Sequence, residues 1–274
     1  MRQFARVVGY TLIDQMRQKS FYVLLGVSLL LVLMLKSCYT GNYSVNGQTM
    51  DSASVAWTAS RAAFHVIGYA SLLVGTLLAM SILRRDRDQG SMVLFLSRPI
   101  ARWHYLFGRV VGVWAVAAGF MFVLHAAIYV ISLVSSGGVL PWLLAASAVC
   151  FANLLLATTL VTLLSLFIPE VMAALATLGI VAIGAALDGW FYSFMQSDIG
   201  KQALASQADR PMPIWYLLWP KFTALQTFAV SMTDKNAFHL TSGILPVVNT
   251  CAWLAVLGVA LWFRFERENV GGAE

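Results

Sequence analysis

Residues 83–109 read LRRDRDQGSMVLFLSRPIARWHYLFGR and form a long charged segment between two apolar runs. Six of the chain's eighteen Lys and Arg residues lie in it, namely Arg84, Arg85, Arg87, Arg98, Arg102 and Arg109. Residues 92–96 interrupt these charges with consecutive apolar side chains. Basic flanks are typical of the cytoplasmic face of a membrane protein, and an apolar strip suits a short helix that lies in the interface or docks in a partner's groove. We therefore predict that a partner protein acts on this segment.

The composition is that of an integral membrane protein. Of the 274 residues, 59% are hydrophobic and 11% are charged, and the mean hydropathy is +0.76, whereas soluble domains carry roughly 25% charged residues. The net charge of +6 and pI near 9.4 do not indicate nucleic acid, because the basic residues flank apolar runs. A membrane surface is the expected counter-charge.

Six apolar runs predict an all-α polytopic protein that forms a single transmembrane domain over residues 1–274. The first run is short and reaches the roughly 20 residues needed to span a bilayer only with its flanks. No small-x-small cleavage site follows it, so it is expected to be a retained helix rather than a signal peptide. The six spans are expected at about 21–35, 62–83, 108–134, 140–168, 171–189 and 243–263.

Residues 1–19 are predicted to form an amphipathic helix in the plane of the interface. Apolar side chains recur every four residues, at Phe4, Val8, Leu12 and Met16, while most charges fall elsewhere around the helix. This pattern is typical of an interfacial helix. The alternative is an ordinary charged cytoplasmic tail.

The distribution of Lys and Arg predicts the orientation. With six spans and a cytoplasmic N-terminus, twelve of the eighteen basic residues fall in inside segments and six in outside segments. The inside segments are also shorter in total, so the positive-inside rule places both termini in the cytoplasm. Residues 84–107 then form a cytoplasmic segment.

The external segment, residues 190–242, does not look like a simple loop. It contains the aromatic runs WFYSF at 190–194 and IWYLLWP at 214–220, and three prolines divide it. Apolar stretches that are too short to span and are bounded by prolines predict re-entrant or interfacial helices. The alternative is a small folded loop with an aromatic belt.

The spans offer little chemistry for catalysis or metal binding. His125 is expected to pack against a partner hydroxyl or carbonyl, and Asn153 with Thr158, Thr159 and Thr162 is expected to join helices. Asp188 and Glu170 are expected near water, at span ends, where neither needs a buried partner. The sequence also lacks the HExxH and GxSxG motifs. We assign no catalytic, cofactor-binding or metal-binding residue, and we predict that the chain is not an enzyme.

An energy source for transport is also missing from the sequence. The single Gly-Lys pair, Gly200-Lys201, has Met195 and Gln202 where a phosphate loop needs glycine and a hydroxyl residue. The spans also lack the buried acids and histidines of a proton-driven carrier. Active transport would therefore require a separate ATPase subunit.

The stretch DRDQGSMVLFLSRPIARWHYLFGRVVG resembles the segment after the second span of bacterial ATP-binding-cassette (ABC) type-2 permeases. The matching positions are Asp88, Gly90, Leu94, Leu96, Ser97, Pro99, Arg102, Gly108 and Arg109. The N-terminal helix is similar to that family's elbow helix, and the layout resembles the copper-maturation and gliding-motility permeases. Glutamate is commoner than Asp88 at the acidic position of the family.

The resemblance implies a permease subunit of an ABC exporter in the bacterial inner membrane. It would pair with a second, identical or different permease subunit and with two cytoplasmic ATPase subunits, which would bind ATP and Mg; a periplasmic or lipid-linked protein is a further candidate partner. The substrate path would lie between permeases, along the second and fifth spans. The implied ATPase-coupling residues are Asp86, Asp88, Gly90, Leu94, Leu96, Ser97, Arg98, Pro99 and Arg102.

Two other functions remain open from the sequence. The chain would also suit a non-transporting membrane scaffold or anchor of an envelope complex, or a secondary carrier. The charged segment would then be a solvated basic connector that fixes the topology. Its apolar strip argues against this, because a plain connector gains nothing by exposing consecutive apolar side chains.

Overall fold

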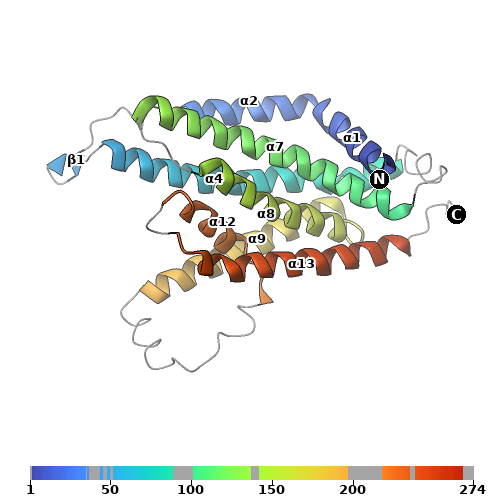
Figure 1. Cartoon of the computed structure of the whole chain (residues 1–274). Helices are drawn as coiled ribbons and strands as arrows, with labels where there is room; N and C mark the ends of the chain where they lie inside the picture. The colour runs from blue at the N-terminus through green and yellow to red at the C-terminus, as the bar shows by residue number, and fades with distance from the viewer. Residues whose placement is uncertain are drawn as a thin grey trace, which may run out of the picture.

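The computed structural model describes residues 2–34, 36, 44–45, 48–49, 52–88, 101–136, 142–196, 218–234 and 238–267. Helices make up nearly all of them, as predicted (Figure 1). The short strands Ser44–Val45 (β1) and Gln48–Thr49 (β2) pair antiparallel, with Ser44 opposite Thr49. The helices are α1 (Arg2–Met16), α2 (Lys19–Met34), α4 (Ser52–Met80), α5 (Ile82–Asp88), α7 (Arg102–Ser136), α8 (Leu143–Leu164), α9 (Glu170–Gln196), α12 (Phe222–Ser231) and α13 (Leu240–Glu266).

Five of these helices, α4, α7, α8, α9 and α13, are long and apolar enough to cross a membrane. The pair α1 and α2 gives a sixth candidate, with a bend of 69° between the two helices. On its own, the 16-residue α2 is about 24 Å long, somewhat less than the roughly 30 Å of a bilayer's hydrocarbon core. The prediction of a multi-pass all-α protein is confirmed.

Several helices extend beyond their expected ends. Helix α4 begins at Ser52, before the expected start of the second span near residue 62, and a turn at Ser81 separates it from α5. Helix α7 already begins at Arg102, and α9 continues to Gln196. These extensions are polar or aromatic, so a search for apolar runs does not include them.

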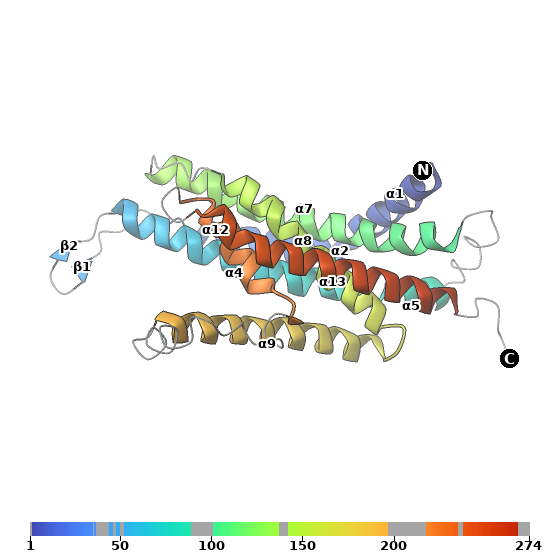
Figure 2. The same ribbon diagram turned by 60° about the horizontal axis from the view of Figure 1, so that its bottom comes forward.

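The core of the bundle is formed by α7 and α8 together with α4, and residues far apart in sequence meet there. In the most apolar stretch of α8, 61% of the residues are buried, compared with 28% in that of α9 and 22% in that of α13. Figure 2 shows α9 along one side of the bundle. Helices α7 and α8 have no single apolar face, as expected for helices buried among other helices. The outer faces of α9 and α13 carry large apolar side chains that suit lipid or another membrane subunit.

The start of α1, the end of α13 and the helix α5 lie at one end of the bundle (Figures 1 and 2). At the same end, Arg102 Nη1 at the start of α7 donates a hydrogen bond to the carbonyl oxygen of Glu266 at the end of α13 (3.1 Å). We call this the terminal end. An arrangement with the start of α1 and the end of α13 at the same end agrees with an even number of spans.

Candidate functional site

A buried ion pair at the terminal end joins the beginning of the charged segment to the third span. Asp86 lies in α5 and Arg109 lies one to two turns into α7, and Arg109 Nη2 donates to Asp86 Oδ1. Tyr105, one turn before Arg109, donates its hydroxyl to Asp86 Oδ2. The residues Asp86 and Arg109 are 3% and 2% exposed. A carboxylate removed from water in this way is stable only when it is paired and hydrogen-bonded.

The N-terminal helix contributes to the same site through two neighbouring residues. Arg109 Nη1 donates to Thr11 Oγ1 at 3.3 Å, and the Thr11 hydroxyl donates to the carbonyl oxygen of Val7 at 2.9 Å. The Arg109 guanidinium also lies 5.1 Å from the centroid of the Tyr10 ring, within the range of a cation–π contact. One guanidinium therefore joins α1, α5 and α7. We call Thr11, Asp86, Tyr105 and Arg109 the base cluster.

Two glycines of α7 make this close approach possible. A Cβ atom at Gly108 would lie 2.8 Å from Val7 Cγ1, and a Cβ atom at Gly112 would lie 2.5 Å from Thr11 Cβ. Gly108 and Gly112 are four residues apart, so they lie on one face of α7, and Val7 and Thr11 form the matching pair on α1. Small residues at this spacing are typical of closely packed membrane helices.

The buried face of α1 differs from the one that the apolar pattern indicated. Phe4, Val8 and Leu12 are half-buried and Met16 is exposed, whereas the fully buried residues are Val7, Thr11 and Gln15. The predicted helix is present, and its orientation to a membrane surface stays a prediction. Polar Thr11 and Gln15 hid the buried face from hydrophobic periodicity, but the sequence Gly108-x-x-x-Gly112 was a visible signal for it.

The predicted coupling residues are placed only in part. Asp86 belongs to the base cluster, Arg102 reaches Glu266 at the end of α13, and Asp88 ends α5. The other predicted residues, Gly90, Leu94, Leu96, Ser97, Arg98 and Pro99, lie outside the described residues. Sequence reasoning missed the roles of Thr11 and Tyr105, whose contacts depend on the tertiary fold.

A second buried polar cluster fixes the start of α12 at the level of the middle of α4 and α8. The residue before this helix, Lys221, provides no side-chain cap. Instead, Asp188 of α9 accepts through Oδ2 from the backbone N–H of Ala224 (3.2 Å) and through Oδ1 from Lys221 Nζ (3.3 Å). A carboxylate at a helix N-terminus satisfies free N–H groups and interacts favourably with the helix dipole. Asp188 therefore caps α12 from another helix.

This arrangement corrects the expectation that Asp188 needs no buried partner. Asp188 is 8% exposed and Lys221 is 2% exposed. The two residues are 33 positions apart with prolines between them, so spacing gave no sign of the pair.

Two asparagines hold the start of α12 from other sides. Asn153 Nδ2 of α8 donates to the carbonyl oxygen of Phe222 at 2.8 Å, and Asn249 Oδ1 of α13 accepts from the backbone N–H of Lys221 at 3.1 Å. From α4, the Tyr69 hydroxyl bonds to Thr223 Oγ1 at 2.7 Å. Residues of α4, α8, α9 and α13 thus contact this short helix. We call Asn153, Asp188, Lys221 and Asn249 the α12 cluster.

The remaining intramembrane polar residues follow the predictions in part. His125 Nδ1 lies 2.8 Å from Ser147 Oγ, and its ring stacks on Phe64 with centroids 4.1 Å apart, which confirms a packed histidine. Asn153 joins two helices as expected. Thr158, Thr159 and Thr162 instead donate to carbonyl oxygens of their own helix, so the prediction that they join helices is wrong for these hydroxyls.

Within the described part of the chain, no group of three or more His, Cys, Asp or Glu residues is placed to hold a metal ion. The base cluster and the α12 cluster each pair one acid with one base. Such pairs position helices, and their stability depends on both partners. What the two clusters provide is a fixed geometry among helices from different parts of the sequence.

Fold and clusters together define a multi-pass helical membrane protein with one buried ion pair at the terminal end of its bundle and a second at the level of the middle of α4 and α8. The chain belongs to the ABC-2 transporter family, because the model of the ABC-2 family transporter protein matches residues 10–270. It is therefore a transmembrane permease subunit of an ABC transporter, and membership of this family implies partnership with ABC ATPase subunits. Among curated proteins, no match to the chain reaches significance.

Proposed function

We propose that this chain is the permease of an ABC exporter whose transport is driven by ATP hydrolysis on separate subunits. The complex would contain a second permease and two cytoplasmic ATPase subunits that bind ATP and Mg, in a bacterial inner membrane. Residues 84–107 would form the coupling segment, with Leu94 and Leu96 in a groove of the ATPase and the arginines at its acidic rim or at lipid phosphates. The chain itself would have no enzymatic activity.

The base cluster is the observation that supports this proposal most strongly. The charged segment leaves the bundle at α5 and returns at α7, and the Asp86–Arg109 pair joins these two ends. The same arginine contacts Thr11 of α1. A displacement of the segment would therefore move α5, α7 and α1 together, because the pair and the glycine contacts leave little room for independent motion. Rigid-body motion of packed helices is a common way to convert such a displacement into a change of access.

The nature of the cargo follows from what the spans contain. In the described helices, the buried polar groups of the two clusters serve helix–helix contacts. A hydrophobic or amphiphilic cargo, or a protein attached to the complex, suits such spans better than a small polar solute. The family resemblance would place the path between two permeases, along α4 and α9. The likeness to copper-maturation and gliding-motility permeases stays a prediction, as does a periplasmic or lipid-linked partner.

The test uses the complex of this chain with its ATPase, purified from membranes and reconstituted. Leu94→Asp and Gly90→Pro should each leave insertion intact and abolish the dependence of ATP hydrolysis on the permease. Trp142→Asp is the control, because it places the same charge at an exposed position near the other end of the bundle. Wild-type coupling in both segment variants would contradict the role of the segment.

The same experiment separates the two alternative functions. A scaffold would copurify without any effect on the rate of hydrolysis, and transport by a secondary carrier would survive removal of the ATPase. Either result would overturn the proposal.

A further inference from the structure

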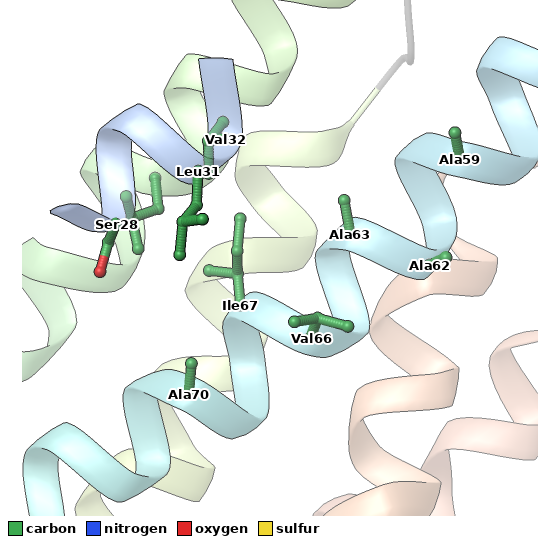
Figure 3. Close-up of a pocket in the computed structure, with 10 residues that line it drawn as sticks. Ser28, Leu31, Val32, Ala59, Ala62, Ala63, Val66, Ile67 and Ala70 are labelled. Carbon is green, nitrogen blue, oxygen red and sulfur yellow. The ribbon is translucent and has the colours of Figure 1, made fainter. Parts of the chain in front are cut away.

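An apolar groove lies between α2 and α4, at the end of the bundle opposite to the base cluster. Its volume is about 450 Å³, which lies within the range of roughly 300–1,000 Å³ for small-molecule sites. Figure 3 shows side chains of α2 and α4 on its two sides. Its floor consists of the buried residues Val32, Ala63, Ile67 and Leu124.

The groove opens to the outside of the bundle between two large apolar side chains. Leu31 of α2 is 60% exposed and Val66 of α4 is 67% exposed. Along its length, α4 contributes Ala59, Ala62 and Ala70 to the lining, and their small side chains leave the space unfilled. Apart from Ser28, the named lining residues carry no side-chain polar atom. An apolar cavity of this kind excludes water and favours a hydrocarbon ligand.

The depth and length of the groove match one leaflet of a bilayer. The candidate span of α4 runs from Trp57 to Met80, and Trp57, with Arg61 over its ring at 4.5 Å, is typical of a headgroup boundary. The groove begins at Ala59, just inside this boundary, and ends at Ala70, near the middle of the span. From Ala59 to Ala70 the helix rises about 16 Å, close to half of the roughly 30 Å hydrocarbon core.

We propose that the α2–α4 groove binds one acyl chain of a phospholipid from the leaflet that surrounds this end of the bundle. The headgroup would remain at the level of Trp57, and the chain would lie over Ala63 and Ile67 with its end near Ala70. Arg61 is two residues from Ala59 and therefore lies on the far side of α4. It marks the depth of the site and makes no contact with the chain. Because the chain is already surrounded by hydrocarbon in the bilayer, binding rests on van der Waals packing against the walls of the groove.

The test is photocrosslinking of the full chain in nanodiscs of phosphatidylethanolamine and phosphatidylglycerol that contain a phosphatidylcholine with a mid-chain diazirine. Peptide mapping should find several-fold more label at Leu31 and Val66 than at Val248. Val248 is a fair reference, because it lies in the half of α13 near the same end of the bundle and is 59% exposed. A bound chain stays beside the groove residues, whereas lipid at Val248 exchanges freely.

A matched pair of variants makes the result specific. Ala62→Phe extends an exposed alanine into the groove and should reduce the label at Leu31 and Val66 to the level at Val248. Ala252→Phe adds the same ring to an exposed position of α13 and should change nothing. Equal label at all three positions, label that persists in Ala62→Phe, or crosslinks between two copies through Leu31→Cys would overturn the proposal; the last would show a second copy on this face.

Discussion

Asp86 and Arg109 are 23 positions apart in sequence, yet they form an ion pair that is almost completely buried. One residue lies where the charged segment leaves the bundle and the other lies where the chain returns to it. The pair therefore closes a loop whose two ends cannot move separately. Thr11 extends this connection to the N-terminal helix, so that three helices depend on a single guanidinium.

Breaking the pair should destabilise the protein. Asp86→Ala leaves the Arg109 charge buried without its carboxylate partner, which costs about 3–5 kcal/mol for a buried pair. The midpoint of thermal unfolding in detergent, read by size-exclusion fluorescence, should fall accordingly. The double variant Asp86→Asn/Arg109→Gln should recover part of the loss, because no buried charge remains. If Asp86→Asn/Arg109→Gln loses as much stability as the sum of the losses in Asp86→Asn and Arg109→Gln alone, the pairing is contradicted.

The close packing of α1 against Gly108 and Gly112 of α7 should be disrupted by a single added methyl group. At Gly112 an added Cβ atom would meet Thr11 at 2.5 Å, and overpacking of this kind costs about 1–3 kcal/mol. Gly112→Ala should therefore lower the unfolding midpoint and increase proteolysis within residues 2–16. Gly119→Ala on the same helix is the control, since nothing lies within 4 Å of its added Cβ atom. Alanine at that position should be neutral or stabilising by up to about 1 kcal/mol.

Removal of the α12 cap should loosen that helix without unfolding the bundle. Asp188→Ala deletes the acceptor for the Ala224 N–H, which as loss of a cap costs about 0.5–2 kcal/mol. It also leaves the Lys221 ammonium buried without its carboxylate, which adds to that cost and brings the total toward about 3–5 kcal/mol, as for a broken buried pair. Asp188→Asn should lose less, because its amide oxygen still accepts from the backbone. Hydrogen exchange over residues 222–231 should increase in the order wild type, Asn, Ala. Unchanged exchange in Asp188→Ala, or an equal increase in Gly189→Ala, whose added Cβ atom meets nothing within 4 Å, would show that the cap is unimportant.

His125 should act in packing rather than in transport. Ser147 is 0% exposed and shares a hydrogen bond with His125, so His125→Leu would leave its hydroxyl buried without this partner at a cost of about 1–3 kcal/mol. His125→Leu/Ser147→Ala should be more stable than His125→Leu alone. ATP hydrolysis that depends on the permease should be retained in His125→Leu/Ser147→Ala. Selective loss of that activity, with full stability, would assign His125 a direct role in transport.

The sequence predicted what depends on local pattern. Apolar runs located the spans to within several residues, and the isolation of His125 among apolar neighbours correctly predicted a packed histidine. The residues around Arg102 and Ser52 fell outside the predicted spans, because polar side chains interrupt the apolar runs there although the helices continue. Helix ends of this kind are determined by backbone hydrogen bonding rather than by hydrophobicity.

The tertiary contacts were harder to predict, because they join residues that no pattern relates. Asp188 and Lys221 come from different helices, and nothing in their spacing indicates a pair. The buried face of α1 contains Thr11 and Gln15, so it resembles a solvent-facing stripe until Gly108 and Gly112 are seen to provide a surface for it. Asp86 was assigned to the charged segment, but its partners Tyr105 and Arg109 follow only from the return of the chain through α7.

The most direct test of how the ATPase acts on this permease uses a photoreactive amino acid at position 94. If the charged segment docks on the ATPase, irradiation of the native complex should crosslink residue 94 to the ATPase subunit, and more strongly during nucleotide turnover. The same amino acid at the exposed position 142, near the other end of the bundle, should give no such product. Failure to capture the ATPase from position 94, or its capture from position 142, would show that the segment lies on the wrong side of the membrane for this role.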